Sequence, residues 1–188
     1  MKKILGLILM LLTIGMASAN PAARPAAIGV SVLSLLAWNP MRLTGVGLDY
    51  GLDEDFARTR LLWLWDLANP LRRVGPLTLS GHMELAMGQT APSPADLTLG
   101  LTPLLEWRWT NLSWAPFIET GLGANYISLT ENRQRSLSTH FQFGEVLGIA
   151  MEYRDLKVGL RYQHLSNADM VLPNNGYNFY GAVLSYRY

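Results

Sequence analysis

Residues 97–109 read LTLGLTPLLEWRW, and every second position of this stretch is apolar. Leucine, proline or tryptophan fills the odd-numbered positions, whereas threonine, glycine, glutamate and arginine fill all but one of the even-numbered positions. Because side chains alternate between the two faces of a β-strand, this stretch predicts a strand with one apolar and one polar face.

The same alternation recurs along the chain in segments of about ten residues, which turn residues separate. It predicts eight strands, near residues 42–51, 57–67, 76–89, 96–109, 113–127, 138–153, 156–166 and 177–188. The stretch 27–36 is ambiguous, because it fits either a short helix or an extension of the first strand. The expected fold class is therefore all-β.

Two all-β architectures fit this pattern: a soluble barrel or sandwich with a dry core, and a membrane barrel whose apolar face points outward. The membrane barrel is favoured because large aromatic side chains lie toward segment ends on the apolar face, as in an interfacial girdle. These residues are Trp63, Trp65, Trp107, Trp109, Tyr186 and Tyr188. The opposite face carries charges able to pair inside a narrow lumen, namely Glu84, Glu106, Arg108, Glu119, Glu152 and Arg161. We therefore expect an eight-stranded antiparallel transmembrane β-barrel, with an interior just filled by side chains.

The N-terminus has the features of a secretory signal peptide. Two lysines near the start are followed by an apolar run over residues 4–16 and by a small-x-small cleavage site at 17–19. The apolar run is too short to span a bilayer as a helix. We expect residues 1–19 to be removed on export, and residues 20–188 to form one barrel domain in the bacterial outer membrane. The final Tyr188 is the kind of terminal aromatic residue that exported barrels commonly carry.

The composition argues against several classes of function. The 15 basic and 14 acidic residues nearly balance and form no basic stripe, so nucleic acid is not an expected partner. The absence of cysteine excludes disulfides and thiol catalysis. We expect no cofactor and no metal, because His82, His140 and His164 fall on different strands, with His82 and His140 on the lumen face.

The candidate chemistry lies at the end of the expected strand 156–166. His164 and Ser166 share the parity of the apolar positions 158, 160 and 162, so they are expected on the lipid-facing side. Side chains two residues apart on one strand face are neighbours, close enough for a base to take a hydroxyl proton. Polar groups on the lipid side of a barrel are costly, and they therefore invite a functional explanation.

The next strand adds a third polar residue to this patch. Asn178 has the parity of the lipid-facing Tyr180 and Leu184, and the strand register allows it to lie beside His164. A nucleophile, a base and an orienting group then share one outward patch, as in a Ser-His triad. His-x-Ser occurs often, however, and interfacial polar residues at a strand end explain the same pattern.

The segment RYQHLSNA at 161–168, followed by PNNGYN at 173–178, resembles the signature of the lipid A 3-O-deacylase (PagL-like) family. Segments 60–66, 116–124 and 141–144 resemble that family as well, so the resemblance covers about residues 57–188. It implies an eight-stranded outer-membrane barrel that hydrolyses the ester at position 3 of lipid A, the lipid part of lipopolysaccharide. It also implies that Ser166 is the nucleophile and that His164 is the general base.

One position departs from the family pattern. Members with a complete Ser-His-Glu triad have glutamate where this chain has Asn178. An asparagine can accept the histidine N–H and hold its tautomer, but it cannot stabilise an imidazolium with negative charge. Either the activity is reduced or another group supplies the charge, for which Asp169 and Glu145 are the candidates. Asn167 and Asn174 match family asparagines, and we expect them to be oxyanion donors through side chain or backbone.

Other functions stay open at this point. A non-catalytic barrel of the structural or adhesive type would have long protruding strands and loops, which this chain largely lacks. A phospholipase or an acyltransferase could use the same serine and histidine, and the calcium dependence known from an outer-membrane phospholipase stays open too. An acyltransferase that measures acyl chains needs an apolar lumen pocket, whereas the lumen face here is charged. The sequence leaves both a monomer and a homodimer open.

Overall fold

The computed structural model describes residues 42–67, 70–92, 96–133 and 135–188, and the regular structure in these ranges consists of strands. No helix long and apolar enough to cross a membrane occurs within them. Eight long strands build the barrel: β1 (Gly45–Asp53), β2 (Phe56–Asp66), β4 (Leu77–Ala91), β5 (Asp96–Trp109), β6 (Ala115–Ile127), β9 (Phe141–Tyr153), β10 (Leu156–Ser166) and β11 (Tyr177–Arg187). Three short strands are β3 (Arg72–Val74), β7 (Glu131–Asn132) and β8 (Arg135–Ser136). The predicted signal peptide 1–19 and the ambiguous stretch 27–36 lie outside the described residues.

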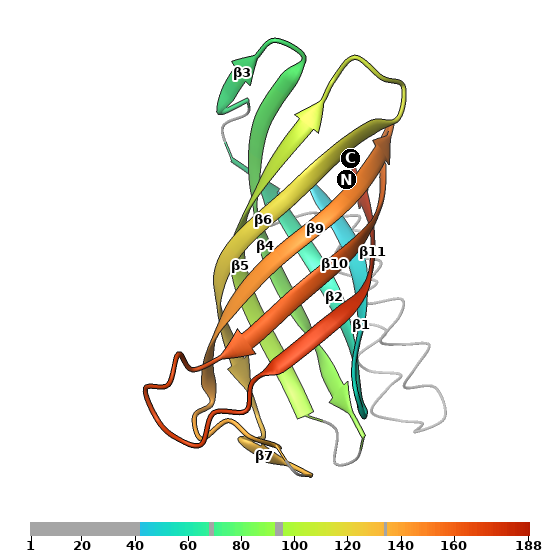
Figure 1. Ribbon diagram of the computed structural model, residues 1–188. Coiled ribbons are helices and arrows are strands. Elements are labelled where there is room, and N and C mark those ends of the chain that lie inside the picture. The colour runs from blue at the N-terminus through green and yellow to red at the C-terminus, as the bar shows by residue number, and fades with distance from the viewer. Residues whose placement is uncertain (1–41, 68–69, 93–95, 134) are drawn as a thin grey trace, which may run out of the picture. The chain divides into compact units, whose positions relative to one another are not determined.

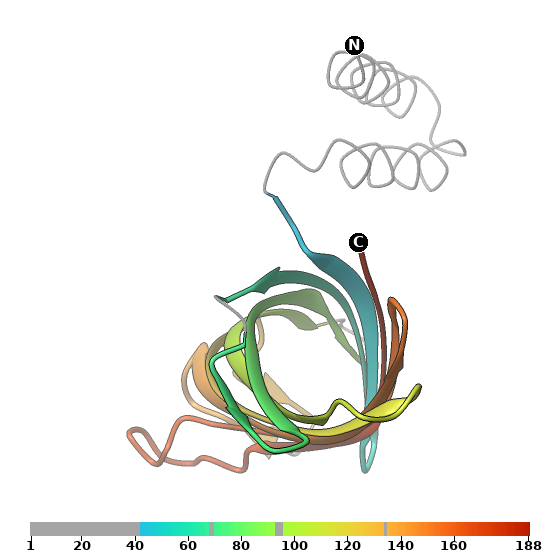
Figure 2. The ribbon, with the colours of Figure 1, turned by 90° about the horizontal axis from the view of Figure 1, so that it is seen from above.

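Each barrel strand pairs antiparallel with two neighbours, and the pairing of β2 with β4 closes the sheet into a ring. Figure 2 shows this closed ring of strands from above. The prediction of an eight-stranded antiparallel barrel is confirmed. The first strand begins at Gly45 rather than at residue 42, and the strand predicted from residue 138 begins at Phe141.

The outer wall of the barrel is apolar. On β5 the outward Leu97, Leu101 and Trp109 are exposed, whereas the inward Thr98 and Glu106 are buried. All six aromatic residues expected in the girdle lie on the outward parity of their strands or just beyond them. A wall of exposed leucine, isoleucine, tyrosine and tryptophan is the surface of a membrane barrel and not of a soluble one.

A connected network of charged side chains crosses the lumen. Arg161 on β10 donates to both carboxylate oxygens of Glu84 on β4, at 2.9 and 3.0 Å, and to Glu119 on β6 at 2.8 Å. Lys157 bonds Glu119 and approaches Glu106 at 3.4 Å. These five residues are almost fully buried, where a charge is stable only beside partners that neutralise it.

The network is larger than the sequence indicated. Arg108 connects Glu106 to Glu152, with N–O distances of 2.7 and 2.8 Å, so the predicted lumen charges all belong to one cluster. Asp49 on β1 adds ion pairs with Arg58 and Arg60 of β2, at 3.2 and 3.0 Å. The expected polar network inside the barrel is therefore confirmed.

Besides the charged network, the barrel interior contains two apolar clusters that the expectation of a charged lumen face did not include. One lies under the loops that carry the candidate site and consists of Phe56, Ile127, Leu137, Leu165, Tyr177 and Phe179. The other consists of Leu62, Leu64, Ala86 and Val183. Alternation alone did not reveal them, because inward leucines and aromatics are exceptions within strands whose other inward positions are polar.

The two ends of the barrel differ. Loop 167–176 between β10 and β11 and the loop holding β7 lie at the same end (Figure 1). The opposite end has the short connections 110–114 and 154–155, together with β3, which pairs with the start of β4. The longest connection, 128–140 between β6 and β9, lies at the end of the candidate site. Because long loops mark the outer side of such barrels, we assign the site to the outer end.

His140 corrects one further expectation. It precedes β9, is exposed, and stacks on the outward Tyr126 with ring centroids 5.6 Å apart, so it does not face the lumen. The alternation did not extend to this residue because the strand begins one position later.

Candidate active site

The candidate site lies where β10 and β11 approach their connecting loop. His164 of β10 pairs in register with Asn178 of β11, and both side chains are partly exposed on the outward face. Ser166, the last residue of β10, has the same outward orientation. The structure therefore confirms the predicted placement of all three residues on the outer wall.

Asn178 fixes the orientation of the His164 ring. Its side-chain oxygen lies 2.9 Å from Nδ1 of His164 and also accepts a hydrogen bond from the Tyr162 hydroxyl at 2.8 Å. An amide oxygen carries no proton, so Nδ1 must be the protonated ring nitrogen in this contact. The other ring nitrogen, Nε2, is then left with a free lone pair and can accept a proton.

Ser166 provides the hydroxyl of the patch. Two residues along a strand correspond to a rise of about 6.5 Å, so the Ser166 and His164 side chains are adjacent on the outer wall. In this part of the described chain, no hydrogen bond joins the two side chains. In free enzymes such contacts are often loose and shorten only when substrate is bound.

Gly176 lies beside the Cε1 atom of the His164 ring, next to the Nδ1 atom that contacts Asn178. Its φ of 65° lies in the left-handed region that glycine adopts readily. A Cβ atom at this position would lie 3.1 Å from Cε1 of His164 and 3.0 Å from the carbonyl oxygen of Leu165. The ring is therefore held between Asn178 and the backbone of Gly176.

The two asparagines expected as oxyanion donors differ in their surroundings. The Asn167 side chain is buried and donates to the carbonyl oxygens of Leu137 and Val171, at 2.9 and 2.8 Å. Its backbone N–H points to the side-chain oxygen of Asn174 at 3.3 Å. The Asn174 amide group donates one hydrogen bond to Asp169 at 3.0 Å and has a second N–H to offer. Both side-chain N–H groups of Asn167 are therefore engaged, and its backbone N–H could serve another acceptor only by leaving the Asn174 oxygen.

The carboxylates near His164 also differ in what they contact. Asp169 bonds Asn174, on the loop rather than beside the ring. Glu145 on β9 is the register partner of His164 on the side opposite Asn178, and it faces outward and is exposed. Asp53 accepts the backbone N–H of Asn178 at 2.8 Å. Of the two predicted candidates for the missing charge, Glu145 is the one adjacent to His164 in the sheet.

A groove in the outer wall runs from this site toward the middle of the barrel. Its first part, of about 610 Å³, begins at Tyr162 and Tyr180, which are the next outward residues after His164 and Asn178. A second hollow of about 520 Å³ continues it and shares Ile149, Leu160 and Ala182 with the first. The groove is lined mainly by apolar side chains, and the small Ala182 leaves the depression between its larger neighbours.

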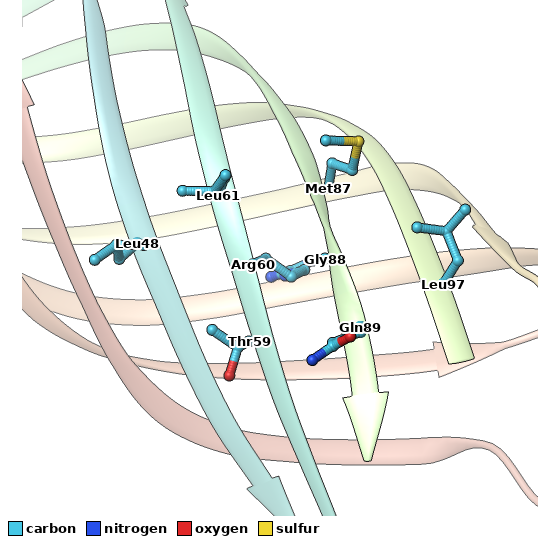
Figure 3. A pocket seen from close by; sticks show the side chains of 8 residues that line it. All are labelled: Leu48, Thr59, Arg60, Leu61, Met87, Gly88, Gln89 and Leu97. Atoms are coloured by element: carbon cyan, nitrogen blue, oxygen red, sulfur yellow. The ribbon is translucent and has the colours of Figure 1, made fainter. Parts of the chain in front are cut away.

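Another hollow on the outer wall, of about 440 Å³, involves β1, β2, β4 and β5 (Figure 3). Thr59 and Gln89, which are register partners, provide its uncharged polar groups. Arg60 also borders it, but its guanidinium bonds Asp49 inside the barrel. This hollow therefore has no nucleophile with an adjacent base.

Among the described residues, no group of three or more histidine, aspartate or glutamate side chains is arranged to hold a metal ion. The outward patch presents two groups of the kind that hydrolases use, the hydroxyl of Ser166 and the imidazole of His164.

Sequence reasoning missed several residues that support the patch. Tyr162 shares the outward parity of His164, so this parity could have identified it. Asp53 accepts the backbone N–H of Asn178, and Gly176 packs beside the His164 ring. Both contacts depend on how the loops pack, which the sequence pattern does not indicate. Arg135, from the loop holding β8, donates to both Asp53 and the carbonyl oxygen of Gly176.

Comparison with known proteins gives consistent results. A protein named lipid A deacylase PagL from Bordetella bronchiseptica is 29% identical over 153 residues, which cover 77% of this chain and 83% of that protein. Its namesake from Pseudomonas aeruginosa is 26% identical over 186 residues, which cover 96% and 95%. The crystal structure of the outer membrane enzyme PagL has the same fold, with a TM-score of 0.72 at 22% identity over 77% of this chain and 99% of that chain.

The family model described as lipid A 3-O-deacylase (PagL) matches residues 56–187, a range that includes seven of the eight barrel strands and the whole outward patch. Because this match covers well over half of the chain, the protein belongs to the lipid A 3-O-deacylase (PagL) family.

Proposed function

We propose that this protein is an outer-membrane esterase that removes the acyl chain at position 3 of lipid A by Ser-His catalysis. Membership of the deacylase family supports the substrate and the reaction class. The observation that carries the mechanism is the contact of His164 Nδ1 with the Asn178 side-chain oxygen, on the same outward patch as Ser166. This contact leaves Nε2 as the basic nitrogen.

In the proposed reaction the Ser166 hydroxyl attacks the acyl carbonyl carbon, and Nε2 of His164 takes the hydroxyl proton. The bond between the acyl carbon and the sugar oxygen then breaks, and His164 gives the proton to that oxygen, which leaves as a hydroxyl group. A water molecule, deprotonated by the same nitrogen, attacks the acyl-serine ester. The bond between the acyl carbon and Ser166 Oγ breaks, and His164 returns the proton to Oγ. This step releases the free fatty acid and regenerates the serine hydroxyl.

The charge that develops on the carbonyl oxygen needs hydrogen-bond donors. The backbone N–H of Asn167 and the free side-chain N–H of Asn174 are our candidates, because both belong to the loop that follows Ser166. The Asn167 N–H would exchange its 3.3 Å bond to the Asn174 oxygen for a bond to the oxyanion. The buried side-chain amide of Asn167 instead holds the loop in place. The negative charge that Asn178 cannot supply to the imidazolium is assigned to Glu145.

The location of the site matches the location of the substrate. Lipid A lies in the outer leaflet, with its ester bonds near the boundary between headgroup and acyl chains. A serine on the outer wall near the outer end can reach such a bond without removing the lipid from the membrane. The apolar groove below Tyr162 and Tyr180 offers a place for the acyl chain during the reaction.

Mass spectrometry of lipid A from cells with and without this protein tests the proposal. We expect a loss of mass equal to one 3-linked acyl chain in lipid A when the protein is present. Removal of a chain from glycerophospholipids instead would identify a phospholipase, and a gain of one acyl chain on lipid A would identify an acyltransferase. Unchanged lipids would contradict enzymatic activity in that membrane.

A further inference from the structure

Arg135 connects the outer hairpin β7–β8 to the candidate active site. Its guanidinium donates to both oxygens of Asp53, at 2.8 and 3.0 Å, and to Glu54 at 2.7 Å. It also donates to the carbonyl oxygen of Gly176 at 2.7 Å. One side chain thus joins the β1–β2 turn, the β7–β8 hairpin and the loop that precedes β11.

Both residues that hold the His164 ring depend on these bonds. Asp53 accepts the backbone N–H of Asn178 at 2.8 Å, and Asn178 contacts Nδ1 of the ring. Gly176 lies against the Cε1 edge of the same ring. Arg135 therefore fixes the supports on two sides of His164 without touching the ring itself.

Further hydrogen bonds join the Arg135 segment to loop 167–176. Ser136 and Asn175 exchange two of them, at 2.9 and 3.0 Å, and the Ser138 hydroxyl donates to the carbonyl oxygen of Pro173 at 2.7 Å. The guanidinium also lies 5.4 Å from the ring centroids of both Phe56 and Tyr177, in the apolar cluster below the loops. The β7–β8 hairpin and the residues that follow it are therefore hydrogen-bonded to loop 167–176 at several points.

We propose that Arg135 is a positioning residue for catalysis, which acts on His164 through Asp53, Asn178 and Gly176. This proposal rests on the function proposed above. A planar guanidinium can bond two carboxylate oxygens and a carbonyl oxygen at fixed angles, which a lysine ammonium cannot reproduce. Without it, the buried Asp53 carboxylate keeps the Asn178 N–H but loses its bonds to the guanidinium, so this support of Asn178 is free to shift.

The test compares Arg135→Ala with Arg133→Ala, a control from the same hairpin. Arg133 is half exposed, and its ion pair with the exposed Asp55 is long, at 3.8 Å. We expect Arg135→Ala to lower kcat on lipid A by about 10- to 100-fold with little change in KM, because small displacements of a base are costly. Arg135→Lys should recover part of the loss, and Arg133→Ala should match the unmodified protein.

Two further measurements separate positioning from a general structural role. In a double-mutant cycle, Arg135→Ala should add little to Asn178→Ala, because both changes act on the same ring. Nitrogen-15 NMR of the His164 imidazole should show the Nδ1–H tautomer in the folded barrel and a mixture of tautomers in Arg135→Ala. The NMR measurement does not depend on lipid A hydrolysis, so it tests the proposal even if the proposed function fails.

An unchanged kcat and an unchanged tautomer in folded Arg135→Ala would overturn the positioning role. Full additivity with Asn178→Ala would overturn it as well. If the proposed function itself is wrong, the result differs: the unmodified protein and Arg133→Ala would then both leave lipid A intact. If Arg135→Ala does not fold, Arg135→Lys carries the same comparisons.

Discussion

The resemblance to a Ser-His-Glu triad implies a glutamate at the position where this chain has Asn178. Its side-chain oxygen can hold His164 in the tautomer that a general base requires, but it brings no charge to the imidazolium that forms during attack. Glu145, on the other neighbouring strand, is the carboxylate in register with His164. Under the proposed function, Asn178 orients His164 and Glu145 supplies the charge.

We expect Asn178→Ala to lower turnover by about tenfold, because the ring loses the hydrogen bond that selects its tautomer. Asn178→Glu should preserve or raise turnover at neutral pH, since it restores both the acceptor and the charge. Steady-state hydrolysis of lipid A by the purified variants measures both effects. An unchanged turnover in Asn178→Ala would show that another group orients His164.

Gly176 provides a second test at the level of single residues. Gly176→Ala adds a methyl group 3.1 Å from Cε1 of His164, so it should shift the ring and reduce kcat strongly. Gly75→Ala is the matched control, because Gly75 also has a positive φ, of 58°, but no atom within 4 Å of the added methyl. In both variants the alanine has to adopt a left-handed backbone conformation, which lowers the stability of the fold by about 1 kcal/mol. Equal activity of the two variants would contradict a role for the packing of Gly176 against the ring.

At the scale of the strands, β10 and β11 place the reactive patch and the groove on one surface. The outward residues run in pairs from His164 and Asn178 through Tyr162 and Tyr180 to Leu160 and Ala182. The polar pair is at the outer end of the strands, and the apolar pairs continue toward the membrane interior.

Because the apolar pairs follow directly below the polar pair, a bulky side chain in the groove should obstruct the acyl chain of the substrate. Ala182→Phe should lower kcat/KM for lipid A by about 10- to 100-fold, because an overfilled apolar site costs about 1–3 kcal/mol. Hydrolysis of a short-chain ester should not change, since a short chain does not reach Ala182. Leu101→Phe on the outer wall of β5 is the control. Equal losses on long and short substrates would show that the groove does not hold the acyl chain.

Alternation along the strands was sufficient to predict the barrel, the outward orientation of His164, Ser166 and Asn178, and the charged lumen. Each of these features depends only on the period of two, which is fixed by local geometry. The supports of the site could not be predicted in this way. Arg135 and Asp53 are 82 residues apart in sequence, and the contact of Asp53 with Asn178 spans 125 residues.

For the molecule as a whole, the lumen network holds opposite walls of the barrel together. Arg161 on β10 reaches Glu84 on β4 and Glu119 on β6, and all three are buried. Such a network stabilises the barrel only while every charge keeps its partner.

Arg161→Ala should therefore destabilise the barrel by about 3–5 kcal/mol, because it removes the ion-pair partner of the buried Glu84 and leaves Glu119 with Lys157 alone. Unfolding in urea, followed on the refolded barrel in detergent micelles, measures the change. Arg133→Ala, which removes a long and exposed ion pair, should change stability by less than about 1 kcal/mol. Equal stability of the two variants would show that the lumen network contributes little.

The most direct test of the account is the release of fatty acid from purified lipid A by the refolded barrel and its Ser166→Ala, His164→Ala and double variants. Both residues face outward, so all variants should fold and keep the resistance to heat of the unmodified barrel. We expect each single change to lower kcat by several orders of magnitude, and the double change to add little, because nucleophile and base act as one unit. Substantial activity in folded Ser166→Ala or His164→Ala would contradict the account.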